Sequence, residues 1–282
     1  MSEPQQQWTE TIESKHSLFD LKLKEVWRYK DLVYMFVKRD FVSGFKQTIL
    51  GPLWFFINPI FTTIVFVFVF GNIAKLSTDG IPQVLFYLAG ITLWNYFSSC
   101  LTGTSNIFTA NASIFGKVYF PRLVMPITIV ISNLMKFGVQ FMLFLAVWIF
   151  YFSKGQIQPN IWILATPFLI VLMAIFALGV GMIFSALTTK YRDLQMLLTF
   201  GVSLMMYATP VIYPVSSITG VWKKLAYYNP LTGIFECFKY GWMGSGEFTL
   251  EMLLISTGII LVLLVIGTVT FNKVEKSFMD TV

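Results

Sequence analysis

Lys136 stands out among the residues that could do chemistry, because it is a basic side chain inside a long apolar stretch. An ionisable residue within a membrane-spanning segment is by default a hypothesis for a functional site. Its ammonium group could bind an anionic group of a ligand or a carboxylate of a partner. The alternative is that Lys136 lies nearer the end of the span, where its long side chain simply reaches the membrane surface.

The sequence contains no grouping of residues that predicts catalysis. Gly116 and Lys117 are followed by Val118 and lack the upstream glycine of a P-loop, so the chain has no such loop to hold ATP. Cys100 and Cys237 are far apart in the sequence, which predicts neither a disulfide nor a metal site. An enzyme is therefore the weaker interpretation.

Long apolar runs are the elements that must position Lys136. The chain has 282 residues, of which 56% are hydrophobic and 12% charged, whereas soluble domains average about 25% charged residues. A membrane-spanning helix needs roughly 20 apolar residues. The runs predict an all-α integral membrane protein with six transmembrane helices, over residues 54–74, 84–105, 125–152, 163–187, 195–214 and 252–272.

The N-terminal region divides into a polar tail and a basic amphipathic helix. Residues 1–17 are polar and lack an apolar run, which predicts a tail without a cleavable signal peptide. Apolar residues recur at helical spacing over residues 18–50, with lysine and arginine between them. This pattern is typical of a cytoplasmic interface helix that lies in the membrane surface, or of a helix packed on a soluble partner. Residues 51–282 then form the six-helix domain.

The distribution of lysine and arginine predicts the orientation of the chain. With alternating spans, most of these residues fall on the side that holds the N-terminal helix, the segments 105–124 and 188–194, and the C-terminal end. Cytoplasmic loops carry the excess of Lys and Arg. Both termini are therefore predicted to be cytoplasmic.

The segment near 215–250 is too apolar for a free loop and too interrupted for a full span. Pro230 and Gly233 break it, and Glu236 and Lys239 are charged. It predicts a pair of short re-entrant helices before the last span, which dip into the outer leaflet where protein or water covers their backbone. An ordinary extracellular amphipathic helix is the alternative.

Two short cytoplasmic loops are basic and partly aromatic. They are NASIFGKVYFPRLVMP at residues 111–126 and TTKYRDLQ at residues 188–195. Apolar and aromatic side chains on a cytoplasmic loop favour a helix that docks into the groove of a partner. A plain connector between spans is the alternative for either loop.

Four blocks of the sequence resemble, in the same order, the ABC-2 family of transporter permeases. They are VKRDFVSGFKQTILGPLWFFINPI (37–60), FGKVYFPRLVMP (115–126), KYRDLQMLLTFGVSLMMYATPVIYP (190–214) and YYNPLTGIFECFKYGW (227–242). Within that family the chain is most similar to the exporters of O-antigen, capsule and teichoic acid. The resemblance implies the transmembrane subunit of an ATP-binding-cassette exporter that moves a lipid-linked polysaccharide across the bacterial cytoplasmic (inner) membrane.

The resemblance also implies partners. The chain would form a homodimer and pair with two copies of a separate nucleotide-binding ATPase. It would bind no cofactor itself, because ATP and Mg would lie on the ATPase. A missing P-loop agrees with this division of labour.

Specific roles follow from the resemblance. A coupling helix near 112–123 would contact the ATPase, through Ile114, Phe115, Gly116, Lys117, Val118, Tyr119, Phe120, Pro121 and Arg122. Arg39 and Asp40 would add a second contact. Arg192 and Asp193 would brace the cytoplasmic ends of the fourth and fifth spans, each charge offsetting the desolvation of the other. Glu236 is a further gating or structural candidate.

A polysaccharide needs a hydrated path lined by rings and hydroxyl groups, since sugar faces pack on aromatic planes and sugar hydroxyls need polar partners. Side chains that could line this path are Trp94, Asn95, Tyr96 and Phe97 in the second span, Lys136 in the third, and Tyr207 and Tyr213 in the fifth. The alternative is that these rings pack against lipid or other helices.

Two other functions stay open at this point. One is the export of a drug or small lipid by a member of the same family, which would need a narrower path. The other is a membrane-embedded glycosyltransferase, which would need carboxylates near a membrane face. Asp40, Asp193 and Glu236 are the acidic residues available for that role, and they are scattered along the sequence.

Overall fold

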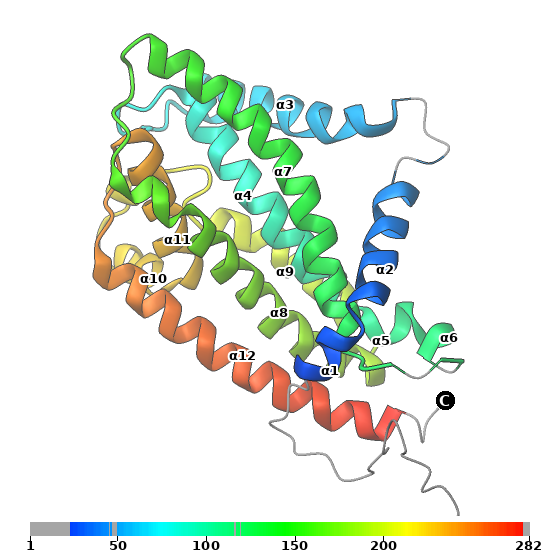
Figure 1. The fold of residues 1–282 in the computed structure, drawn as a ribbon. Coiled ribbons are helices and arrows are strands. Elements are labelled where there is room, and N and C mark those ends of the chain that lie inside the picture. Colours follow the sequence, from blue (N-terminus) through cyan, green and yellow to red (C-terminus); the bar gives the residue numbers. More distant parts are fainter. Residues whose placement is uncertain (1–22, 45, 47–49, 116, 119, 279–282) are drawn as a thin grey trace, which may run out of the picture.

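The computed structural model describes residues 23–44, 46, 50–115, 117–118 and 120–278, and this part of the chain is helical without a strand (Figure 1). The predicted all-α membrane fold is therefore confirmed. The polar tail predicted for residues 1–17 lies outside the described residues, as do Gly116 and Tyr119.

Five segments of the described chain are long and apolar enough to cross a membrane: Gly51–Ile73, Gln83–Thr104, Val124–Ser153, Ile161–Lys190 and Leu250–Val274. The first joins η1 (Gly51–Leu53), α3 (Trp54–Phe66) and η2 (Val67–Ile73). The others are α4 (Gln83–Thr104), α7 (Val124–Ser153), η3 (Ile161–Ala165) with α8 (Thr166–Lys190), and α12 (Leu250–Phe278). Each corresponds to a predicted span.

The span predicted at 195–214 is shorter than expected. Helix α9 (Leu194–Ala208) has 15 residues, fewer than the roughly 20 that a full crossing needs. The helix stops before Pro210, because a proline disfavours the helical conformation in the residue that precedes it. The Asn229 amide donates to the Ala208 carbonyl at 3.1 Å, which satisfies one acceptor that the helix end leaves open.

The N-terminal amphipathic segment forms two helices instead of one. They are α1 (Leu23–Arg28) and α2 (Lys30–Ser43), and they are separated at Tyr29. Helix α2 packs along α7 and buries Val33 and Val37 (Figure 1). This contact places α2 beside the segment that connects α4 to α7.

Short helices follow α9, as the sequence predicts for this segment. They are η4 (Val215–Ser217), α10 (Val221–Tyr228) and α11 (Pro230–Met243). Asn229 begins α11 because its side chain accepts a hydrogen bond from the amide of Leu231 at 3.0 Å. Gly244 ends it in the left-handed conformation, at φ 72°. Helices α10 and α11 lie at the end of the molecule opposite α1, α5 and α6 (Figure 1).

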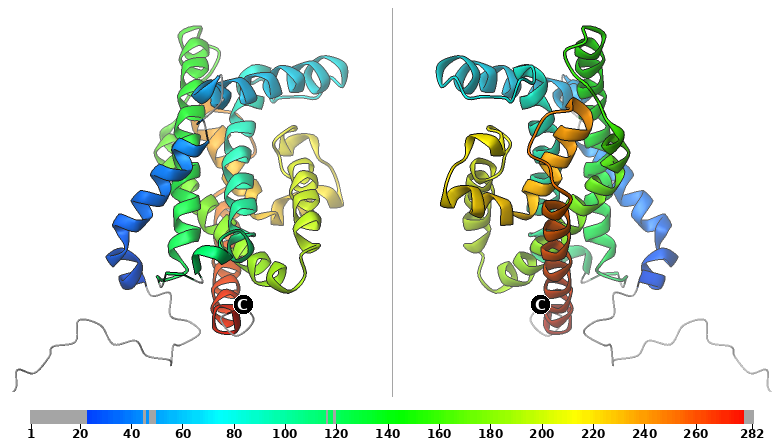
Figure 2. Two further views of the ribbon diagram at one scale, coloured as in Figure 1. Left: turned by 90° about the vertical axis from the view of Figure 1, so that its right-hand side faces the viewer. Right: turned by 90° about the vertical axis from the view of Figure 1, so that its left-hand side faces the viewer.

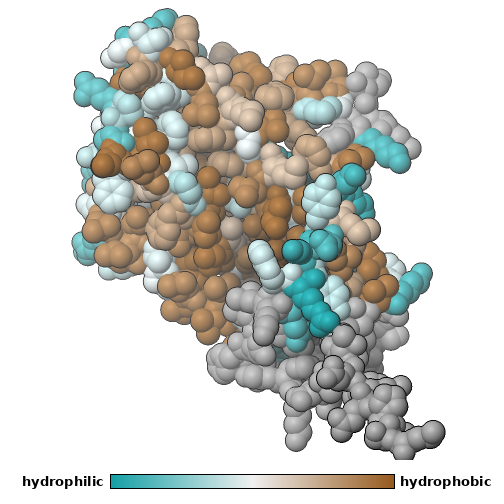
Figure 3. Space-filling view, viewed as in Figure 1, coloured by the Kyte–Doolittle hydropathy of each residue, from teal (hydrophilic) through white to brown (hydrophobic). Residues whose placement is uncertain are grey.

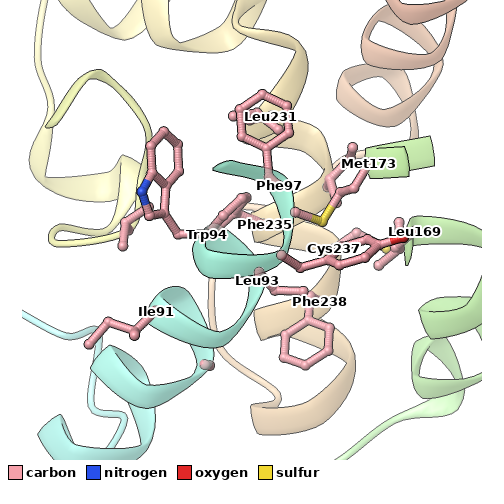
Figure 4. Packing of buried hydrophobic residues seen from close by; sticks show 14 of the residues in the cluster. Ile91, Leu93, Trp94, Phe97, Leu169, Met173, Leu231, Phe235, Cys237 and Phe238 are labelled. Carbon is pink, nitrogen blue, oxygen red and sulfur yellow. The ribbon is translucent and has the colours of Figure 1, made fainter. Parts of the chain in front are cut away.

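The core forms where α4, α8, α11 and α12 pack together. Helices α8 and α12 approach closely at Gly179 and Gly267, since a side-chain carbon on Gly179 would lie 2.9 Å from the Leu264 amide. Small residues allow this approach between helices in a membrane. Phe97 stacks on Phe176 at a ring separation of 5.1 Å. Figure 4 shows Phe97 among buried residues from α4, α8 and α11.

The outer surface suits a lipid environment. Figure 3 shows hydrophobic residues over most of one face and hydrophilic residues mainly near its edges. Large apolar side chains such as Met142, Phe150 and Leu254 are exposed. Figure 2 shows α3 and α9 on the same side of α4. The space bounded by these three helices is the part of the fold that positions the candidate site.

Candidate functional site

A hollow of about 420 Å³ lies between α3, α4 and α7. We call it the cationic hollow, because Lys136 is the charged residue in its wall. The other lining residues are mostly amides and hydroxyls: Asn58, Thr62, Asn95, Ser99, Asn133 and Gln140, with the rings of Phe55, Tyr96 and Phe137. Polar groups of this density are costly inside apolar helices, so they indicate a wet or ligand-bearing surface.

Hydrogen bonds organise the amides of the cationic hollow. The ammonium of Lys136 donates to the side-chain oxygen of Asn133 at 3.2 Å. The Asn95 amide donates to the side-chain oxygen of Gln140 at 3.2 Å and so links α4 to α7. Among the described residues, no carboxylate lies within ion-pair distance of Lys136. The hollow therefore presents a cation that has no counter-ion among the described residues.

A second hollow of about 510 Å³ lies between α3, α4 and α9. We call it the aromatic hollow, because Trp94, Tyr207 and Phe66 contribute rings to its wall. Hydroxyls stand between the rings, from Thr62, Ser98, Ser99, Thr102, Thr199 and Ser203. The two hollows adjoin, since Thr62, Asn95 and Ser99 line both.

Helical periodicity explains why these polar groups meet. On α4 the polar residues Asn95, Ser99 and Thr102 recur at four- and three-residue steps, which places them on one face. Asn133, Lys136 and Gln140 do the same on α7. Both stripes line the cationic hollow, and the α4 stripe also lines the aromatic hollow.

Most of the predicted path residues lie at the hollows. Tyr96 and Lys136 line the cationic hollow, Trp94 and Tyr207 line the aromatic hollow, and Asn95 lines both. Phe97 does not, because its ring is fully buried in the core against Phe176. Tyr213 is absent from both walls, and its hydroxyl donates to the Tyr207 carbonyl at 2.8 Å.

Sequence reasoning missed the residues that share a helix face with the predicted ones. Asn133 and Gln140 lie on the same side of α7 as Lys136, and Ser98, Ser99 and Thr102 continue the stripe that begins at Asn95. The signal was present in the sequence as polar residues at helical spacing inside apolar runs. The contributions of Asn58 and Thr62 depend on how α3 crosses α4, which the sequence does not display.

The segment between α4 and α7 is less helical than the expected coupling helix at 112–123. It contains two helices of one turn, α5 (Ile107–Ala110) and α6 (Ala112–Phe115), and the described residues that follow Phe115 are not helical until Val124. Pro121 lacks an amide donor, which disfavours a continuous helix here. Of the nine proposed contact residues, Gly116 and Tyr119 lie outside the described part of the chain.

A cluster of phenylalanine rings anchors this segment to the rest of the fold. Phe120 contacts Phe36 of α2 at a ring separation of 6.0 Å and Phe115 at 5.5 Å. Phe108 stacks on Phe271 of α12 at 4.7 Å. We call these five residues the ring cluster. It joins the connecting segment to α2 and to the last span.

The residues of the segment between α4 and α7 differ in exposure. Phe115, Phe120, Pro121 and Arg122 are buried, and the Arg122 guanidinium lies 5.6 Å from the centre of the Phe115 ring. Ile114 is half-buried, whereas Lys117 is exposed and Val118 is 58% exposed. Lys117 and Val118 are therefore the described residues that could contact a partner directly.

Arg39 and Asp40 lie near the end of α2 and form an ion pair with each other at 2.8 Å. The Arg39 guanidinium also lies 4.7 Å from the centre of the Phe36 ring. Because Phe36 contacts Phe120, this end of α2 is connected to the ring cluster. An exposed pair of this kind contributes little to stability, typically 0–1 kcal/mol.

Arg192 and Asp193 do not form with each other the paired brace that the family resemblance implies. Both are exposed in the turn between α8 and α9. No ion pair joins them in the part of the chain that the structure describes. Exposed charges of this kind are offset by water, so they need no partner.

Glu236 and Lys239 form a buried ion pair on α11, with 3.5 Å between the carboxylate and the ammonium. The Lys239 ammonium also donates to the Pro210 carbonyl at 2.5 Å and lies 4.0 Å from the centre of the Phe86 ring. The Glu236 carboxylate accepts from the Glu247 amide at 3.1 Å. The pair therefore ties α11 to the end of α9, the start of α4 and the loop before α12.

Span-length apolar helices with polar hollows between them define an all-α, multi-pass membrane protein. A model of the family described as ABC-2 type transporter matches residues 31–243. The chain therefore belongs to the ABC-2 type transporter family.

Relatives of known name support this placement. The chain is 31% identical over 253 residues to the O-antigen export system permease protein RfbA of Klebsiella pneumoniae, which covers 89% of this chain and 94% of the relative. It is 29% identical to RfbA of Myxococcus xanthus over 70% of this chain and 73% of that protein. It is 24% identical to the polysialic acid transport protein KpsM of Escherichia coli over 86% and 93%.

Proposed function

We propose that this chain is the transmembrane permease subunit of an ATP-binding-cassette exporter that moves a lipid-linked polysaccharide, similar to O-antigen, across the bacterial cytoplasmic membrane. Relatives over most of the chain are named for the export of O-antigen and the transport of polysialic acid. A cargo of the same chemical class is the simplest inference for this chain.

The adjoining hollows are the observation that carries the proposal. They place the aromatic rings of Trp94, Tyr207 and Phe66 among hydroxyls from three helices. Sugar rings present C–H faces and hydroxyl groups, so such a wall suits them better than it suits an apolar cargo. Asn95 and Gln140 add amide groups to the adjoining wall. A path lined in this way stays hydrated within an apolar protein.

ATP hydrolysis belongs, in this proposal, to a separate ATPase subunit that carries the nucleotide and Mg. The sequence lacks a P-loop. Two permease chains would pair with two ATPase chains. The ATPase would contact Lys117 and Val118, and the ring cluster would pass its movement to α2 and α12. Arg39 and Asp40 would add a second contact, because α2 is joined to the same cluster.

Orientation follows from the same assignment. Helices α1, α5 and α6 and the C-terminal end of α12 lie together at one end of the molecule, and α10 and α11 lie at the other (Figure 1). Both termini and the coupling segment would then face the cytoplasm. Helices α10 and α11 would be the re-entrant region at the outer side.

Two alternatives are less well supported. A drug or small-lipid exporter of the same family would need a narrower path, and an apolar cargo would not use the many amides and hydroxyls that both hollows carry. A glycosyltransferase would need carboxylates that converge. Asp40 lies on α2, Asp193 lies in the turn before α9, and Glu236 is buried against Lys239.

Reconstitution tests the function directly. The purified chain and its ATPase would be placed together in liposomes and supplied with labelled, lipid-linked polysaccharide and ATP. We expect transport only when both proteins and ATP are present. Liposomes with a P-loop variant of the ATPase are the matched control.

Three outcomes would contradict the proposal. The chain by itself hydrolyses ATP, or it moves the polysaccharide without any ATPase, or the complex moves only apolar drugs or lipids. The first two would remove the division of labour, and the third would assign a different cargo.

A further inference from the structure

We propose that the cationic and aromatic hollows form one binding site for a glycosyl phosphate, with the phosphoryl group at Lys136 and the sugar ring between Trp94 and Tyr207. This inference deepens the proposed function and rests on it, since it names the part of the cargo that the permease recognises.

The position of the phosphoryl group follows from Lys136, which has no anionic partner among the described residues. An ammonium group has three N–H donors, and Lys136 gives one of them to the side-chain oxygen of Asn133. The groups that line the hollow around it are amides, hydroxyls and rings. A cation in an apolar protein is stabilised by an anion. The described part of the chain supplies no such anion at this place.

The arrangement of donors favours a tetrahedral oxyanion over a carboxylate. The Gln140 side-chain oxygen accepts from Asn95, which leaves the NH2 group of Gln140 free to donate. Asn58 and Ser99 also line the hollow, from α3 and α4. Donors thus approach from three helices. A phosphoryl group has oxygens in several directions to meet them, whereas a carboxylate has two oxygens in one plane.

The position of the sugar follows from the wall that the two hollows share. Thr62, Asn95 and Ser99 line both hollows, so the space beside the phosphoryl position leads directly to Trp94 and Tyr207. A sugar bonded to that phosphate would reach the rings without a linker. Ser98, Thr102, Thr199 and Ser203 would meet its hydroxyls.

Binding of small probes to the purified full-length chain tests this site. The chain would be held in nanodiscs of zwitterionic lipid, and affinity would be measured by NMR titration. The probes are glucose 1-phosphate, methyl glucoside and inorganic phosphate. We expect glucose 1-phosphate to bind at least about tenfold more tightly than either half alone, because it fills both hollows.

Substitutions should separate the two halves. Lys136→Met should remove the tenfold preference for glucose 1-phosphate over methyl glucoside, since a charge-assisted hydrogen bond is lost. Lys136→Arg should keep most of it. Tyr207→Ala should weaken glucose 1-phosphate and methyl glucoside by the same factor and leave inorganic phosphate unchanged. Met135→Ala, a neighbouring exposed position on α7, is the matched control and should change none of the affinities.

Gln140→Leu keeps the test valid if Lys136→Met does not fold, because it removes a donor from the same hollow without removing the charge. A smaller loss of the same preference is expected. Equal affinity for the three probes, or unchanged preference in Lys136→Met and Gln140→Leu, would overturn the proposal.

Phospholipid headgroups carry the same phosphate chemistry, so a second set of nanodiscs contains phosphatidylglycerol. We expect little competition with glucose 1-phosphate, because the lipid has no sugar ring for the aromatic hollow. Strong competition that depends on Lys136 would assign the hollow to bilayer lipid and overturn the proposal. The binding assay needs neither ATP nor transport. Failed polysaccharide transport with intact probe binding would therefore refute the proposed function and leave the site standing.

Discussion

At the scale of single residues, the buried pair of Glu236 and Lys239 is the most consequential electrostatic feature outside the hollows. Both side chains are almost completely inaccessible, at 0% and 1% exposure. Each charge therefore depends on protein groups. Lys239 contacts the Pro210 carbonyl and Glu236 accepts from the Glu247 amide, so the pair determines how two loops meet α11.

Removing one member of this pair should destabilise the protein more than removing both. Lys239→Met leaves the Glu236 carboxylate buried without a partner, and Glu236→Gln leaves the Lys239 charge, which costs about 3–5 kcal/mol. The double variant replaces both charges with neutral groups and should lose less than either single variant. Apparent melting temperatures of the purified proteins in detergent measure these differences.

The ion pair of Lys223 and Glu247 serves as the control for these variants. Their ion pair is exposed at 40% on each side chain, and Lys223→Met should change the melting temperature very little. Strictly additive losses in the double variant at 236 and 239 would show that the two charges do not stabilise each other.

The residues around Lys136 also explain why the cationic hollow is a candidate site. Lys136 lies about 18 Å along α7 from its start, at 1.5 Å per residue. Its position alone does not distinguish a site from a side chain that reaches the membrane surface. The hydrogen bond from Lys136 to Asn133 and the facing amides of Asn95 and Gln140 indicate a site.

At the scale of elements, the segment between α4 and α7 combines a buried half with an exposed half. The ring cluster holds the buried half against α2 and α12. Lys117 and Val118 form part of the exposed half. A segment built in this way can transmit the movement of a bound partner to α2 and α12, because the rings join the segment to these helices.

Val118→Asp should disrupt coupling to the ATPase without unfolding the permease. Val118 is exposed in this chain, so the substitution costs little in the isolated protein. In the complex it would place a charge in an apolar contact. We expect a loss of transport and of permease-dependent ATPase stimulation of at least about tenfold, with an unchanged melting temperature of the permease.

Ser113→Asp on α6 is the matched control, because Ser113 is also exposed and lies outside the proposed contact set. Phe115→Ala gives the opposite signature, a loss of stability of about 3–5 kcal/mol as a ring leaves the cluster. A Val118→Asp complex that assembles and transports like the wild type would show that the ATPase docks elsewhere.

At the scale of the whole molecule, the short helices lie at two opposite ends. Helices α5 and α6 lie at one end and α10 and α11 at the other (Figure 1). The lipid-facing surface between the ends is largely apolar (Figure 3). A polar cargo that crosses this molecule needs the hollows beside α4, because they interrupt the apolar region.

Labelling with a membrane-impermeant maleimide tests the proposed orientation. Cys100 and Cys237 are both buried, so the native background should be low. Ser113→Cys should react only in inside-out vesicles, and Val221→Cys, at an exposed position of α10, only in intact spheroplasts. Reaction of both positions from the same side would refute the topology, and the reverse pattern would place the termini outside.

Several features of this protein were determined by the sequence alone. The length and apolarity of the runs predict six spans, and five of these are span-length helices in the described structure, since a helix satisfies its own backbone groups wherever water is absent. The break predicted at Pro230 coincides with the start of α11, whereas the break predicted at Gly233 is wrong, because Gly233 lies inside that helix. The four sequence blocks indicate the transporter family, which the comparison with family models confirms.

Other features depend on contacts between residues far apart in the chain, and only the tertiary structure decided them. The sequence suggested Phe97 as a path residue, but packing buries it on Phe176. Arg192 and Asp193 are neighbours that form no pair in the described structure, while Glu236 pairs with Lys239 one helical turn away. Hydropathy specifies which helices enter the membrane. The rotation and crossing of each helix depend on side-chain packing, and these decide which polar faces meet.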